Sequence, residues 1–110
     1  MNKFKVSFEG LIDAINHKAV RIQLILGVMA VIGGIIIKLD YYEWLAFIVC
    51  IGMVITTEIM NTAVEKIGDY LNKEYDTDIK LIKDLSSGAV LASSLMALAV
   101  CLFCVFRRIL

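Results

Sequence analysis

The chain has 110 residues, eleven basic and eleven acidic, and 60% of its residues are hydrophobic. Its mean hydropathy of +0.83 is high for a soluble domain, and its charges lie between long apolar runs. The length suits one domain over residues 1–110, and the absence of a basic cluster argues against a nucleic-acid partner.

The segment from Lys3 to Arg21 has an amphipathic pattern. Its apolar residues recur at spacings of three and four, the period of a helix with one apolar face: Phe4, Phe8, Leu11, Ile12, Ile15 and Ala19. We therefore expect a helix over about residues 3–20 that lies on a membrane surface. The segment contains acids and lacks a small-residue cleavage pattern, so we do not expect a signal peptide.

Three apolar segments that suit membrane-spanning helices follow, at about residues 22–39, 44–68 and 85–106. The third contains 22 consecutive uncharged residues, enough to cross a hydrocarbon layer about 30 Å thick at about 1.5 Å per residue. The first has an uncharged run of 14 residues that Gln23 and a snorkelling Lys38 extend. The second continues past Glu58. We expect residues 40–43 to form a short polar turn, with Trp44 at the membrane interface.

The basic residues are distributed unevenly between the two ends of these spans. Eight lie in the N-terminal segment and in the polar stretch between residues 66 and 83, against three at Lys38, Arg107 and Arg108. Basic residues concentrate on the cytoplasmic side of membrane proteins. We therefore expect the N-terminus and the longer polar loop to face the cytoplasm, where ATP is present.

The third span carries small side chains at intervals of four, namely Ala89, Ser93, Ala97 and Cys101. This stripe indicates close helix packing, within one chain or between chains. Cys101 and Cys104 have CxxC spacing but no neighbouring His or Asp. We expect these thiols to behave as small hydrophobic groups.

Carboxylates and an amide gather at the end of the second span. At about 100° per residue, Glu58, Glu65 and Asp69 share one helix face, and Asn61 and Thr62 flank it. An acid inside an apolar helix is a functional hypothesis by default. Counted from Trp44, Glu58 should lie about 21 Å into a layer about 30 Å thick, and Glu65 about 10 Å farther, at the water boundary. One carboxylate can then meet a lipid hydroxyl and the other a hydrated cation.

The chain contains none of the motifs of the common phosphate-binding folds: GxxxxGK[ST], GxGxxG, HRD or DFG. Mg²⁺ is commonly held by one or two carboxylates together with phosphate oxygens. The placement of Glu58 within the membrane and Glu65 at the water boundary therefore suits phosphate transfer from ATP to a membrane lipid by a kinase of another design.

One family carries this combination of motifs. The segment Glu58-Ile-Met-Asn61-Thr-Ala-Val-Glu65, followed by Asp69, Glu74-Tyr75, and Lys83-Asp84 ahead of Gly88-Ala-Val-Leu, resembles the prokaryotic diacylglycerol kinase and undecaprenol kinase family. The likeness covers residues 7–91. It implies an all-α, multi-pass protein of the bacterial cell membrane that forms homotrimers with active sites shared between chains. It also implies ATP and a lipid alcohol as substrates, with Mg²⁺ as cofactor.

The resemblance also implies roles for individual residues. Glu58 matches the base that takes the proton from the lipid hydroxyl, Asn61 the residue that orients the reacting groups, and Glu65 a ligand of Mg²⁺. The other matching positions are nucleotide contacts at Glu74, Tyr75, Asp76, Lys83 and Asp84, a lipid contact at Ser87, and supporting residues at Asp69 and Arg21.

Two positions depart from the family pattern. The family has a second metal-binding glutamate where this chain has His17, and another glutamate where it has Gln23. Imidazole is a poor ligand for Mg²⁺, a hard cation that prefers oxygen. Three explanations stay open: Glu9 or Asp13 supplies the carboxylate, Glu65 suffices with water and phosphates, or activity is reduced.

Two other functions compete with a lipid kinase. One is a catalytically silent homologue that acts as a membrane binding or assembly protein because His17 breaks the metal site. The other is a small ion carrier built on Glu58, which has no need of Glu65, Asp69 and the Lys83-Asp84 pair. Among acceptors, the segment from Lys83 to Leu91 favours undecaprenol over diacylglycerol by resemblance.

Overall fold

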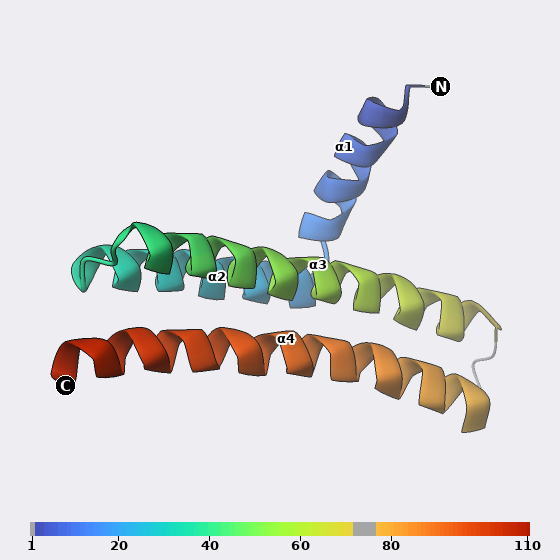
Figure 1. The fold of residues 1–110 in the computed structure, drawn as a ribbon. Helices are drawn as coiled ribbons and strands as arrows, with labels where there is room; N and C mark the ends of the chain where they lie inside the picture. The colour runs from blue at the N-terminus through green and yellow to red at the C-terminus, as the bar shows by residue number, and fades with distance from the viewer. Residues whose placement is uncertain (1, 72–76) are drawn as a thin grey trace.

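A computed structural model describes residues 2–71 and 77–110 of the chain (Figure 1). In these ranges the secondary structure is entirely helical, with α1 at Lys3–Ile15, α2 at Lys18–Ile36, α3 at Tyr41–Leu71 and α4 at Thr77–Ile109. Helices α2, α3 and α4 are long and apolar enough to cross a membrane. The expected all-α class, with a short N-terminal helix and three spans, is confirmed.

The three long helices form a loose layer rather than a closed core. Helices α3 and α4 run side by side, and α2 packs against α3 (Figure 1). Only 11%, 22% and 17% of the apolar windows of α2, α3 and α4 are buried within the chain. Exposed apolar surface of this extent requires a lipid environment or other protein surfaces, since water disfavours it.

The N-terminal helix ends earlier than its apolar periodicity suggests. Helix α1 stops at Ile15, and His17 has an extended backbone (φ −89°, ψ 132°) directly before α2. Asn16 sits at the break, in agreement with the tendency of asparagine to compete with helical hydrogen bonds. Val20, 1% exposed, anchors the start of α2. Helix α1 then points away from the other helices (Figure 1).

A Schellman turn ends α2 at Ile36, three residues before the end of the span that the sequence suggests. Lys38 adopts a left-handed backbone (φ 58°). The Leu39 N–H donates to the Gly34 carbonyl (3.0 Å) and the Lys38 N–H to that of Ile35 (3.2 Å). These two bonds satisfy carbonyls that a helix end leaves without partners.

Asp40 and Glu43 form a capping box at the start of α3, so residues 41–43 are helical and do not form the expected turn. The Glu43 N–H donates to Asp40 Oδ1 (2.9 Å), and the Asp40 N–H donates to Glu43 Oε1 (3.0 Å). Each side chain thereby satisfies a backbone N–H that has no partner within the helix.

Arg108, near the end of α4, joins this turn to the rest of the molecule. Its guanidinium donates to both carboxylate oxygens of Glu43, at 2.7 Å from Nη1 and 2.6 Å from Nη2. It also donates to the carbonyls of Ile37, Lys38 and Cys104. All five N–H groups of the guanidinium are therefore used. Glu43 is 5% exposed, so this pair closes one end of the helix layer.

Candidate functional site

Glu58, Asn61 and Glu65 come together on one face of α3. The Asn61 Nδ2 group donates to Glu58 Oε2 (3.4 Å) and to Glu65 Oε1 (3.2 Å). Glu58 and Asn61 are each 8% exposed, whereas Glu65 is exposed. The spacing i, i+3, i+7 places the three groups on consecutive turns of one helix face. A buried and an exposed carboxylate are thus joined through one amide.

The carbonyl oxygen of Asn61 is buried and has no hydrogen-bond partner among the described residues. In this orientation the NH₂ group donates to both carboxylates, which leaves the carbonyl oxygen bonded to neither of them. A buried acceptor without a donor is unfavourable. The site therefore lacks one donor or cation that a bound reactant can supply.

A hydroxyl pair joins α3 to α4 beside Glu58. Thr57 Oγ1 and Ser93 Oγ are 3.0 Å apart. The same oxygens lie 3.0 Å from the Val54 carbonyl and 2.9 Å from that of Val90. Two hydroxyl protons serve these three contacts, so only two bonds exist at any moment. Ser93 belongs to the stripe of small residues, whose packing role within the chain is confirmed at this position.

The outer part of the carboxylate stripe is occupied by ion pairs. Lys83 Nζ lies 2.5 Å from Asp69 Oδ1, and Lys80 Nζ lies 2.6 Å from Asp84 Oδ2. Lys83 and Asp84 thus bond to different partners, and both lie in α4 rather than in a loop because that helix begins at Thr77. Gly68 permits the close approach, since a Cβ there would lie 2.8 Å from Lys83 Cε.

Two of the remaining predicted residues, Arg21 and Ser87, belong to the described part of the chain. Arg21 and Ser87 are exposed on α2 and α4. The predicted nucleotide contacts at Glu74, Tyr75 and Asp76 fall outside the described residues. The roles of all these residues stay predictions.

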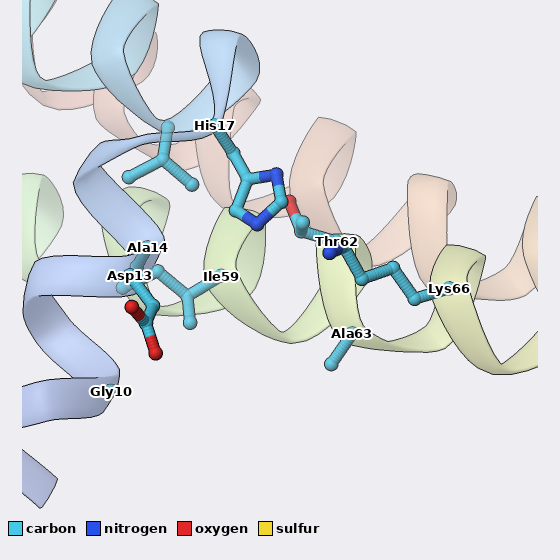
Figure 2. A pocket seen from close by; sticks show the side chains of 9 residues that line it. Gly10, Asp13, Ala14, His17, Ile59, Thr62, Ala63 and Lys66 are labelled. Carbon is cyan, nitrogen blue, oxygen red and sulfur yellow. The ribbon is translucent and has the colours of Figure 1, made fainter.

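His17 lines a pocket of about 260 Å³ between α1, the start of α2 and α3 (Figure 2). The other polar residues that line this pocket are Asp13, Thr62 and Lys66, and Glu65 does not line it. Within residues 2–71 and 77–110, no three His, Cys, Asp or Glu side chains are close enough to hold a metal ion. A one-chain metal site made by Glu65 and His17 therefore finds no support in these contacts.

The carboxylate cluster nevertheless suits Mg²⁺ in its choice of atoms. Glu65 offers an exposed carboxylate, and Asn61 a carbonyl oxygen without a partner. Mg²⁺ prefers oxygen ligands and takes only one or two protein carboxylates when phosphates and waters complete its shell. Glu65 is therefore the residue of this cluster best suited to hold the cation.

Three features of the structure have no counterpart in the sequence pattern: the Thr57–Ser93 pair, the shared pocket of Lys66 and His17, and the burial of Glu43. Thr57 gave a weak signal, as a polar residue next to Glu58 in an apolar run. Neither Lys66 nor Glu43 could be found by its own pattern, because each contact joins different helices.

Comparison with known proteins agrees with the motif. Residues 5–105 match the family described as prokaryotic diacylglycerol kinase. A segment of 57 residues is 32% identical to the undecaprenol kinase of Bacillus subtilis (strain 168). That segment is 52% of this chain and spans 46%, less than half, of that enzyme. With the family match covering nearly the whole length, the chain belongs to the prokaryotic diacylglycerol kinase family.

Proposed function

We propose that this membrane protein transfers the terminal phosphate of ATP to the hydroxyl of a membrane lipid. The observation that carries the proposal is the pairing of buried Glu58 with exposed Glu65 through Asn61. Such a pair can serve an acceptor in the bilayer and a donor in water at the same time. Family membership supports the same reaction class.

Within this proposal, Glu58 accepts the proton of the lipid hydroxyl. The base must lie within hydrogen-bond reach of that proton, and a base positioned in this way contributes about 10²–10⁴-fold to the rate. Asn61 holds the carboxylates of Glu58 and Glu65 through its two N–H groups. Its unpaired carbonyl oxygen can serve as a second oxygen ligand for the cation.

Glu65 is assigned to hold Mg²⁺ at the water boundary. When bound, the cation supplies charge neutralisation at the phosphate oxygens. Lys83 is held by Asp69 on the same side of the helix pair, where its ammonium group can contact a nucleotide. The cytoplasmic location of this end, and a homotrimer with shared sites, belong to the same proposal.

The acceptor we favour is undecaprenol, in line with the name of the B. subtilis relative. The test uses purified protein in detergent with ATP, Mg²⁺ and either undecaprenol, dioleoylglycerol or no lipid. We expect radioactive phosphate from ATP to appear in the extracted lipid, more with undecaprenol than with dioleoylglycerol. Faster transfer to dioleoylglycerol would reverse the acceptor assignment. No transfer to either lipid would contradict the kinase and favour the silent homologue.

A further inference from the structure

The pocket at His17 contains two basic side chains and borders the face of α3 that carries the carboxylate cluster. Lys66 reaches into it from α3, and His17 from the junction of α1 and α2 (Figure 2). The pocket volume of about 260 Å³ is far above the roughly 10–15 Å³ that a cavity needs to hold one water molecule. The pocket therefore has room for a tetrahedral anion.

Within residues 2–71 and 77–110, no carboxylate forms an ion pair with either basic side chain. Figure 2 shows the end of the Lys66 side chain directed toward His17 and Thr62, whereas the carboxylate of Asp13 points away from both. The imidazole of His17 also makes no capping bond to α2. Their N–H donors are therefore available to a ligand.

One wall of the pocket is bonded to the backbone of the predicted base. The Thr62 hydroxyl donates to the backbone carbonyl of Glu58 (2.9 Å), so its proton is not available to a ligand. Thr62 instead ties the pocket wall to the helix turn that carries Glu58. The other walls include apolar Val20 and Ile59, which suit a group at the boundary between lipid and water.

We propose that Lys66 and His17 form a binding site for a terminal phosphate group. An ammonium group in the pocket disfavours a second Mg²⁺ and favours an anion, and ionised donors make strong hydrogen bonds to phosphate. Only the identity of the molecule that carries the phosphate rests on the proposed function; the binding of phosphate itself does not. A lipid phosphate and a nucleotide phosphate share this chemistry, and experiment separates them.

The test measures binding to the full chain in detergent micelles by ³¹P nuclear magnetic resonance titration. The probes are inorganic phosphate, dioleoyl phosphatidic acid, and ADP without divalent cations. Lys66→Met and His17→Ala should each weaken binding of at least one probe about tenfold or more, because each removes a hydrogen bond to a charged group. Lys66→Arg should retain most of the affinity, since it keeps the cation.

Lys18→Met is the matched control. It removes the same charge from an exposed lysine next to His17 that does not line the pocket. Its affinities should stay within about twofold of the unchanged protein, as exposed charges are screened by salt. Circular dichroism of each variant checks that the helices persist.

Each outcome decides the proposal. Weakened phosphatidic acid binding alone assigns the site to the lipid phosphate, and weakened ADP binding alone to the nucleotide. Unchanged binding of all three probes in Lys66→Met, or an equal loss in Lys18→Met, overturns the site. Inorganic phosphate binding does not depend on the kinase reaction, so an inactive protein whose phosphate binding requires Lys66 would contradict the proposed function and leave this site standing.

Discussion

Glu58 and Glu65 bond to the same amide, yet one is buried and the other is exposed. This difference in exposure is what separates their assigned roles. A buried carboxylate in an apolar helix is costly unless it is bonded, and Asn61 supplies that bond. An exposed carboxylate stays hydrated and can exchange water for a cation without a large desolvation penalty.

Glu58→Gln should remove the base while keeping side-chain volume and hydrogen bonding. We expect turnover to fall about 10²-fold or more, because general-base catalysis is lost. ATP binding should be retained. Steady-state transfer to lipid and a separate nucleotide-binding measurement check both points. A variant that keeps most of its turnover would show that Glu58 is not the base.

Glu65→Gln should affect the metal rather than the lipid. The amide keeps one oxygen but loses the negative charge that attracts Mg²⁺. We expect the Mg²⁺ concentration for half-maximal activity to rise, with the lipid dependence little changed. Titrations of activity with Mg²⁺ and with the lipid measure the two dependences separately. Normal Mg²⁺ dependence in this variant would make Glu65 an ordinary surface acid.

At the level of single elements, two adjacent glycines near the end of α2 have different surroundings. A Cβ at Gly34 would lie 2.7 Å from Leu39 Cδ1 and 2.9 Å from Trp44 Cη2. A Cβ at Gly33 would have nothing within 4 Å. Gly34 is therefore required by the turn that folds Leu39 back onto the helix, whereas Gly33 is not.

Gly34→Ala should destabilise the protein by about 1–3 kcal/mol, the usual range for overpacking a filled space. Gly33→Ala should leave stability unchanged or raise it by up to about 1 kcal/mol, because alanine is the better helix former. Unfolding of both variants in SDS with mixed micelles, followed by circular dichroism, compares them. Equal effects would contradict the close packing of Leu39 against Gly34.

At the scale of the whole molecule, contacts between distant parts of the chain close the end where α2 meets α3. Arg108 bonds to Glu43, 65 residues away, and to the Ile37 carbonyl, 71 residues away. Arg107 is a weaker partner, since it lies 3.3 Å from both Asp40 and Glu43 and its side chain is 51% exposed. The two neighbouring arginines thus offer an internal comparison.

Arg108→Met should lower the SDS concentration at which the protein unfolds, because it leaves the Glu43 carboxylate without its bidentate partner. Arg107→Met should have a smaller effect, as expected for an exposed pair. Arg108→Lys should unfold at an SDS concentration between those of the other two variants, since lysine keeps the charge but cannot donate two parallel hydrogen bonds to the carboxylate. A lower SDS concentration of unfolding for Arg107→Met than for Arg108→Met would contradict our inference that the Arg108 contacts contribute most to holding this end of the molecule together.

The sequence by itself determined the fold class, the three spans and the face shared by Glu58, Asn61 and Glu65. These features depend on local periodicity and helix geometry, which a single segment carries. The family motif lies in the same segment, and the family match agrees with it. The sequence also indicated the departure at His17, which the structure then placed beside Lys66.

Only the tertiary structure decided which side chains from different helices meet. Asp69 pairs with Lys83, Thr57 with Ser93, and Glu43 with Arg108, in each case between α3 and α4. The break at Asn16 and the early start of α4 at Thr77 also differed from the periodic pattern. Such contacts and boundaries depend on helix packing, and no local pattern records the register between two helices.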